Sequence, residues 1–207
     1  MRSGPVWLRD EHRDPAAPGS TKQVTKALRS FVGYLSLSGL CDAKLAGAVP
    51  SVAYWRLLQV PNVVSDEQLR RLIGAFDRRT ALGRRDYAIV QCLVGLGLRA
   101  SEAAHLGLDD IDWRSGTMRL TGKPRRVRLL PLPAAVGSAI ADYLRRDRPA
   151  TAHRLIFVRH TAPLGAPLTS GAVGAVVRAA WRRTGLQIRF RGTHALRHYS
   201  ASRTISE

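Results

Sequence analysis

The stretch DYAIVQCLVG, residues 86–95, is apolar on nearly every face when it is wound as an α-helix. A helix on a protein surface carries a single apolar stripe, so this pattern predicts a helix at the centre of a core. The apolar run of residues 88–98 is interrupted by Gln91 and is well short of the roughly 20 residues that span a bilayer. We therefore expect a globular domain built around this helix, with no membrane span.

The central helix is followed by a turn that carries a charged pair. Gly95 and Gly97 end the helix, and the segment LRASE, residues 98–102, begins the next one. Arg99 is therefore predicted to lie in a turn against the buried helix. An arginine in such a place is either paired structurally, with Glu102 as its nearest partner, or held for a ligand, and the local sequence leaves both interpretations open.

The other helices and strands of this domain are predicted from helix caps and from changes in the spacing of apolar residues. The segment SDEQ, residues 65–68, is a capping box and predicts the start of a helix. Apolar spacing predicts two further helices, over residues 133–148 and 169–183. Short strand-like runs separated by turns predict a three-stranded antiparallel meander and one more buried strand; they are residues 108–111, 117–120, 126–129 and 155–158. The predicted fold class is mainly α with a small three-stranded antiparallel sheet (α+β).

The first third of the chain has a different character. Residues 1–20 contain several prolines and charges without periodicity, which predicts a disordered tail. Apolar residues then recur at helical spacing up to Gly39, and a shorter helix is predicted over residues 42–48. One helix cannot bury its own apolar stripe, so residues 21–60 are predicted to be part of a helical domain followed by a linker. Residues 61–207 form the main domain.

The net charge is the strongest compositional signal. The chain of 207 residues has 33 basic and 15 acidic residues, a net charge of +18, and 29 of the basic residues are arginine. Codon bias explains arginine in place of lysine, but it does not explain the surplus over acidic residues. The charge favours a nucleic acid as partner, while solvated charge or an anionic membrane surface stay open as alternatives.

Cysteine usage and the N-terminus give no sign of export or of metal binding. Cys41 and Cys92 have no metal-ligand spacing, and Cys92 lies inside the apolar run, where a buried thiol is expected. The first 20 residues have no apolar segment of the kind that a signal peptide carries. The sequence therefore predicts a cytoplasmic protein without a metal, and it contains no glycine-rich loop for a nucleotide cofactor.

Two further features combine residues that suit phosphate chemistry. Lys123 is at the tip of the second turn of the meander, and the other lysines all come before residue 45. A lysine can act as a general acid where an arginine practically cannot, although a solvated turn lysine is the plain alternative. In a helix that begins at Thr193, His194 and Arg197 share one face, where a guanidinium can grip phosphate oxygens beside an imidazole. A solvated helix face is the alternative there.

Taken in order, these features resemble a known family. The segment GLRASE at residues 97–102, Lys123 in a β-turn and the segment HALRH at residues 194–198 together resemble the tyrosine recombinase, or phage integrase, family. The resemblance covers about residues 21–207. It implies an integrase-like catalytic domain preceded by a partial helical core-binding segment that clamps double-stranded DNA.

The resemblance also implies a reaction and a role for each residue. In this family a tyrosine attacks a DNA phosphate and forms a 3′-phosphotyrosyl link, without a metal or a nucleotide cofactor. Arg99 and Arg197 would grip the phosphate and stabilise its transition state. Lys123 would protonate the leaving 5′-oxygen, His194 would assist proton transfer, and Glu102 would hold Arg99.

The sequence departs from the family pattern at its ends. Family members carry the nucleophilic tyrosine roughly thirty residues after the position of Arg197, on a later helix, whereas this sequence ends at Glu207. Tyr199 follows Arg197 on the same helix and is expected to be a packed tyrosine, so we predict no nucleophile. The core-binding segment of residues 21–60 is also short. Both ends are therefore expected to be truncated.

These observations lead to three functional hypotheses. In the first, the chain contributes the phosphate-gripping part of a recombination site, and the nucleophile is missing or comes from another recombinase chain or from self-association on DNA. In the second, it is a non-catalytic DNA-binding remnant of an integrase. In the third, it is a basic RNA-binding protein, which a preference for structured RNA over duplex DNA would support.

Overall fold

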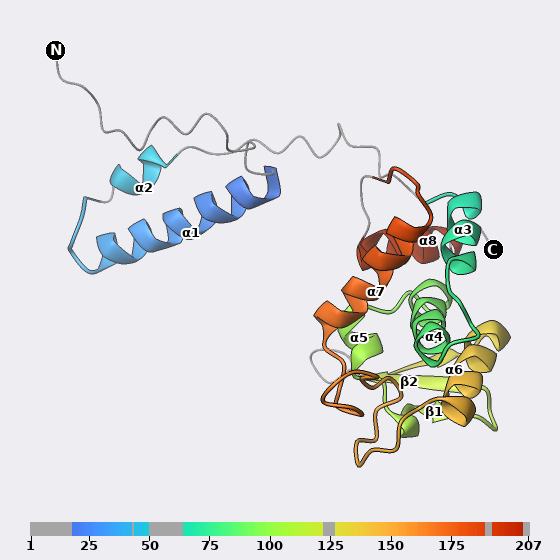
Figure 1. Ribbon diagram of the computed structural model, residues 1–207. Helices are drawn as coiled ribbons and strands as arrows, with labels where there is room; N and C mark the ends of the chain where they lie inside the picture. The colour runs from blue at the N-terminus through green and yellow to red at the C-terminus, as the bar shows by residue number, and fades with distance from the viewer. Residues whose placement is uncertain (1–17, 43, 50–63, 122–126, 189–191, 205–207) are drawn as a thin grey trace. The chain divides into compact units, whose positions relative to one another are not determined.

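The computed structural model describes residues 18–42, 44–49, 64–121, 127–188 and 192–204, and the chain divides into two units (Figure 1). The first unit covers Met1–Val60 and the second covers Pro61–Glu207. Lys123 and the turn around it lie outside the described residues.

The first unit contains the helices α1 (Pro18–Leu37) and α2 (Lys44–Ala48). The Arg29 guanidinium donates to the Val49 carbonyl at 2.9 Å and joins the end of α2 to α1. The predicted disordered tail of residues 1–20 is wrong for its last three residues, because α1 begins at Pro18, where a proline suits the first turn of a helix. Residues 1–17 lie outside the described residues.

The second unit is organised around the helix α4 (Ala81–Gly95), as the sequence predicts (Figure 1). The α4 residues from Ala88 to Leu93 are buried, and Thr80 caps the helix by accepting from the Gly83 amide at 3.0 Å. Five other helices pack directly against α4: α3 (Asp66–Gly74), α5 (Ala100–Ala104), α6 (Ala134–Arg146), α7 (Ser170–Arg183) and α8 (Thr193–Thr204). The predicted capping box at Ser65 is confirmed at the start of α3.

The sheet has three antiparallel strands in sequence order: β1 (Ile111–Asp112), β2 (Thr117–Thr121) and β3 (Val127–Pro131). The predicted fold class is therefore confirmed. In the β2–β3 register Leu120 lies opposite Arg128, so these two side chains share one face of the sheet. Leu120 and Met118 on that face are buried in the core.

Two predicted strands differ from the structure. Leu108–Asp110 is a 3₁₀-helix, because the Asp110 carboxylate accepts from the Gly107 amide at 2.9 Å and closes a tight turn. The predicted strand over residues 155–158 forms only single bridges, Gly107 with Leu155 and Val158 with Pro167. Its middle residues are buried, as the apolar run predicts. The predicted strand pairing is wrong, because only these single bridges form.

Candidate active site

Arg99 is positioned by the turn between α4 and α5. Gly97 has a φ of +61°, and an added Cβ would lie 3.0 Å from the Ser200 hydroxyl, so both the backbone angle and the space favour glycine there. The turn places Arg99 at the N-cap position of α5. Its side chain is 57% exposed, and its charge is therefore accessible from solvent.

Glu102 holds Arg99 through two contacts. The Arg99 backbone amide donates to one oxygen of the Glu102 carboxylate at 2.7 Å, and the Arg99 guanidinium donates to the other at 2.9 Å. The Glu102 side chain is only 12% exposed. Burial raises the pKa of this carboxyl, but the hydrogen bonds from Arg99 and the charges of Arg99 and Arg128 outweigh it and hold the pKa below its ordinary value. Glu102 is therefore a carboxylate at neutral pH.

Arg197 reaches the same carboxylate from α8. Its Nη1 donates to the Gly97 carbonyl at 3.2 Å and lies 3.8 Å from Glu102 Oε2. Its neighbours Ala195 and Leu196 are buried in the core, while Arg197 itself lies against the α4–α5 turn through its contact with Gly97. The Arg197 side chain is 34% exposed, so part of it stays available to a ligand.

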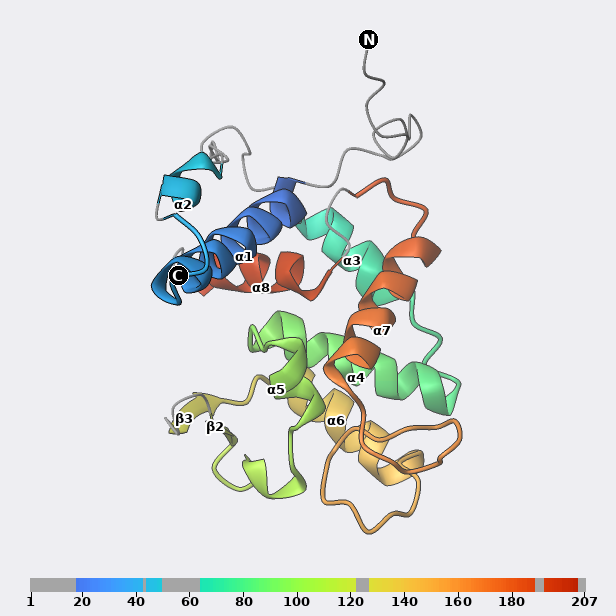
Figure 2. The same cartoon turned by 90° about the vertical axis from the view of Figure 1, so that its left-hand side faces the viewer.

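A cavity of about 230 Å³, which we call the Arg99–Arg197 cavity, joins the predicted residues. Its lining residues come from the α4–α5 turn and from the first residues of α5, α7 and α8: Leu98, Arg99, Ala100, Ser101, Ser170, Thr193, His194 and Arg197. Figure 2 shows α5 lying beside α7, and α8 packs against α4. Since helix N-termini carry partial positive charge, the starts of the two long helices α7 and α8 add to the charge of the arginines. The cavity suits an anion such as a phosphate.

The structure thus brings together four of the five residues that the sequence singled out. Arg99, His194 and Arg197 line one cavity, and Glu102 binds both arginines behind it. Lys123 lies outside the described residues, and the last described residue before it, Thr121, borders a second cavity of about 710 Å³ that also reaches Arg99 and Glu102. The role of Lys123 stays a prediction.

Arg128 is a basic residue of this site that sequence reasoning missed. Its Nη2 lies 3.3 Å from Glu102 Oε1, the oxygen that also accepts from Arg99. One carboxylate therefore faces three guanidinium groups, from Arg99, Arg128 and Arg197, and the cluster has a formal charge of +2. The sequence indicates this role only weakly, because Arg128 is simply a basic residue between two apolar residues in a predicted strand.

The tyrosines described in the second unit are engaged elsewhere. The Tyr199 hydroxyl donates to the Asp66 carboxylate at 2.6 Å, and the side chain is buried, as expected of a packed helix tyrosine. The Tyr143 hydroxyl lies 3.2 Å from His160 Nε2, and burial raises the pKa of Tyr143 to about 12. Among the described residues, none of the side chains that line the Arg99–Arg197 cavity is a tyrosine.

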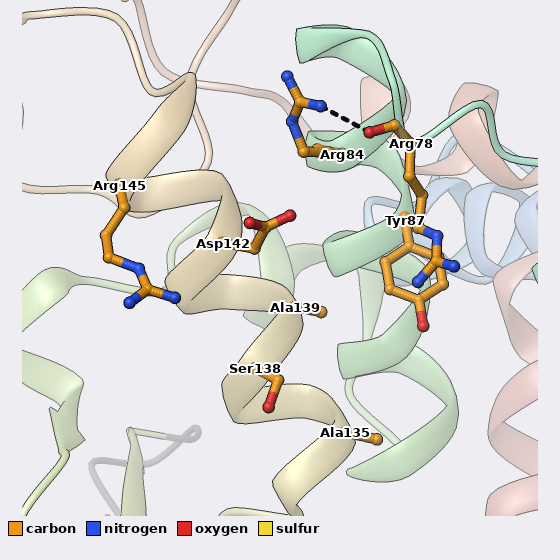
Figure 3. Close-up of a pocket in the computed structure, with 8 residues that line it drawn as sticks. All are labelled: Arg78, Arg84, Tyr87, Ala135, Ser138, Ala139, Asp142 and Arg145. Carbon is orange, nitrogen blue, oxygen red and sulfur yellow. Dashed lines mark hydrogen bonds between the residues drawn. The ribbon is translucent and has the colours of Figure 1, made fainter.

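Another basic cavity, of about 370 Å³, lies between α4 and α6 (Figure 3). Arg84 there is bound on both sides, since it donates to the Asp147 carboxylate at 2.7 Å and to the Arg78 carbonyl at 2.6 Å. The Arg78 guanidinium covers the Tyr87 ring, with its carbon 4.9 Å from the ring centre. The third arginine, Arg145, donates to the Ala141 carbonyl at 3.3 Å. All three arginines of this cavity thus have partners within the protein, and we do not assign it a ligand.

Within the described residues, there is no cluster of histidine, cysteine and acidic side chains that could hold a metal ion. None of the described helices is both long and apolar enough to cross a membrane.

Comparison with known proteins identifies the class of protein. The model of the phage integrase family matches residues 62–207, which is more than half of the chain. The chain therefore belongs to the phage integrase family, the tyrosine recombinases.

The chain is similar in sequence to bacterial relatives from Sinorhizobium fredii. It is 46% identical over 184 residues to a protein described as integrase/recombinase y4rA, covering 89% of this chain and 45% of that relative. It is 38% identical over 149 residues to integrase/recombinase y4gC, covering 70% of this chain and 76% of the relative. The chain spans about half the length of y4rA and of the related y4rF, of which 45% and 46% are covered.

Solved structures share the fold. The Tn1549 transposon integrase aligns with a TM-score of 0.71 and 14% identity, covering 97% of this chain and 70% of that one. The XerH recombinase aligns with a TM-score of 0.59 and 22% identity, covering 79% of this chain and 44% of that one. The mainly helical unit with its small antiparallel sheet is therefore the fold of integrase catalytic domains.

Proposed function

We propose that this protein binds double-stranded DNA and acts in DNA integration and site-specific recombination, with the Arg99–Arg197 cavity as the site that grips the scissile phosphate. The observation that carries the proposal is that Arg99, from the α4–α5 turn, lines one cavity with His194 and Arg197, which come from α8. The net charge of +18 supports a polyanionic partner.

The roles of the residues follow from their positions. In the reaction of this family, a tyrosine oxygen attacks phosphorus, the bond to the 5′-oxygen breaks, and that oxygen takes up a proton. Arg99 and Arg197 together with the Glu102 carboxylate carry a net positive charge, which stabilises the extra negative charge that develops on the phosphate oxygens. We assign this stabilisation to Arg99 and Arg197, proton transfer beside the phosphate to His194, and protonation of the leaving oxygen to Lys123.

The relatives support DNA as the partner. The matched structure of the Tn1549 integrase is a complex with a circular intermediate DNA, and a matched lambda integrase structure is a tetramer bound to a Holliday junction. By analogy we propose that this chain acts with other recombinase chains on DNA. Residues 21–60 would be part of the DNA-clamping segment and residues 61–207 the catalytic domain. A cytoplasmic location stays a prediction.

We further propose that the nucleophilic tyrosine is supplied by another chain. This assignment rests on the cavity lining, which contains no tyrosine among the described residues, and on the contact of Tyr199 with Asp66. The test is a suicide duplex that is nicked near the cleavage site, incubated with this protein alone. We expect binding without a covalent adduct. An adduct that survives denaturation would show that a tyrosine of this chain attacks, and it would overturn the assignment.

A non-catalytic DNA-binding remnant is the second candidate, and it is favoured by the same observation that no tyrosine lines the cavity within the described part of the chain. The two candidates differ when an active recombinase of the family is added. A chain that contributes to the site changes the cleavage rate of the mixture in a manner that depends on Arg197, whereas a remnant competes for DNA whether or not Arg197 is present. Tighter binding to structured RNA than to duplex DNA at equal salt would reject both.

A further inference from the structure

Arg128 lies on the edge strand β3, yet its side chain lies on the inner face of the sheet. It is opposite Leu120 in the β2–β3 register, and Leu120 is buried. Side chains alternate between the two faces of a strand, so Val127 and Leu129 lie on the outer face, where both are exposed. The inner face directs Arg128 toward α5, where it meets Glu102.

The contact joins two elements through one carboxylate oxygen. Glu102 Oε1 accepts from the Arg99 guanidinium at 2.9 Å and from Arg128 at 3.3 Å. With Arg128 present, the single negative charge of Glu102 is divided among three cations. Without Arg128, Glu102 would neutralise Arg99 more completely, and its carboxylate would lose the contact that fixes it from the side of the sheet.

We propose that Arg128 is a positioning residue of the Arg99–Arg197 cavity: by sharing the Glu102 carboxylate, it keeps the Arg99 guanidinium oriented and only partly neutralised, so that Arg99 can bind a DNA phosphate. This inference rests on the proposed function of the cavity. Arg128 does not line the cavity and acts through Glu102. Since the Arg128 side chain is 47% exposed, its removal should not unfold the domain.

The test is a double-mutant cycle with a local probe. Dimethyl phosphate, a small phosphodiester that keeps one negative charge across the working pH range, is titrated into the whole protein. Binding is followed by the NMR signals of the His194 imidazole, which lines the cavity. The four proteins are the unaltered chain, Arg128→Ala, Glu102→Gln and the double variant, and melting temperatures are measured for each.

We expect Arg128→Ala to weaken binding about fivefold and Arg128→Lys to retain most of the affinity, because a lysine can still contact the carboxylate. In the Glu102→Gln background the effect of Arg128→Ala should be less than about twofold, since the carboxylate through which Arg128 acts is absent. Equal effects in both backgrounds would mean that Arg128 acts on the phosphate directly, and would overturn the inference. A lower melting temperature with unchanged binding would overturn it too, because Arg128 would then be merely structural.

A matched control separates this contact from loss of charge. Arg119 is a half-exposed arginine on the neighbouring strand β2, with its Nε 3.6 Å from Asp110. Arg119→Ala removes the same charge from the same sheet without touching Glu102, so it should change binding by less than about twofold. If it weakens binding as much as Arg128→Ala does, charge alone explains the effect and the inference is wrong.

The titration also distinguishes failure of the inference from failure of the proposed function. If dimethyl phosphate leaves the His194 signals of the unaltered protein unchanged, or if Arg197→Ala binds it equally well, the cavity is not a phosphate site and both proposals fall. If Arg197→Ala weakens binding while the Arg128–Glu102 cycle is additive, only the inference about Arg128 falls.

Discussion

Replacement of Arg197 by alanine is the most direct test of the cavity. A guanidinium has five N–H donors. In Arg197, Nη1 donates to the Gly97 carbonyl at 3.2 Å and lies 3.8 Å from Glu102, and its remaining donors make no hydrogen bond with the described residues. They are available to two phosphate oxygens in a bidentate arrangement.

The expected magnitude follows from this geometry. A hydrogen bond between charged groups contributes about 1.5–3 kcal/mol, and the Arg197 side chain is 34% exposed, which places the loss near the lower end. We expect Arg197→Ala to lose about 2 kcal/mol of binding free energy, close to a thirtyfold weaker affinity for dimethyl phosphate. Arg197→Lys keeps the charge but loses the planar arrangement of donors, so its affinity for dimethyl phosphate should lie between those of the unaltered protein and Arg197→Ala.

The assay follows the His194 imidazole signals during the dimethyl phosphate titration, with duplex binding at several salt concentrations as a second measurement. The slope of log affinity against log salt concentration is negative, and removing one phosphate-bound arginine should make it shallower by about 0.9. Arg145→Ala is the control, because Arg145 lies on α6 at the other basic cavity (Figure 3). It should leave dimethyl phosphate binding at His194 unchanged. If Arg197→Ala binds as well as the unaltered protein, or if Arg145→Ala weakens binding equally, the reasoning is refuted.

Three further predictions concern stability and reactivity. Tyr199→Phe should lower the free energy of unfolding by about 1.5 kcal/mol, because it removes the bond to the exposed Asp66 carboxylate at 2.6 Å; an unchanged urea midpoint would contradict this. Cys92 should resist alkylation in the native protein, because burial raises the pKa of its thiol to about 12; fast modification at about pH 8 would count against its burial. The hydrogen bond from Arg84 lowers the pKa of Asp147, so this pair stabilises the fold above the ordinary carboxyl pKa of 3.8, and the contribution disappears as the pH falls through the lowered value. Asp147→Asn should therefore be less stable at about pH 7 and less sensitive to acid; an unaltered acid-unfolding curve would refute this.

The sequence predicted the core of the second unit because its signals there are local. The continuous apolar run of α4 and the capping box at Ser65 each specify a helix without knowledge of the rest of the chain. The run of residues 155–158 was also predicted to be buried, and Ile156, Phe157 and Val158 are buried while Leu155 is partly exposed. Its pairing could not be predicted, because single bridges to Gly107 and Pro167 depend on where distant segments lie. The short 3₁₀-helix at Leu108–Asp110 depends on one side-chain hydrogen bond that an apolar pattern does not reveal.

The candidate site divides in the same way. Arg99 and Glu102 are three residues apart, so their ion pair could be expected from the sequence, and the structure has it at 2.9 Å. His194 and Arg197 share a helix face for the same local reason. Their meeting with Arg99 in one cavity depends on the packing of α8 against α4, which periodicity does not specify; the resemblance to a family supplied that step. Lys123 stays a prediction.

Arg128 shows why an apparent exception to a sequence pattern can be informative. In an ordinary half-buried strand, the apolar residues Val127 and Leu129 would face the core and Arg128 would face water. The structure has the opposite arrangement, with both apolar side chains exposed and the arginine on the inner face beside Glu102. Exposing two apolar side chains forgoes the free energy of burying them, whereas Arg128 stays 47% exposed and its charge is paired with Glu102. This local rule is broken at the point where β3 meets Arg99, Glu102 and Arg197, where we propose that a phosphate binds, so a function of this cluster would account for an arrangement that stability alone does not favour.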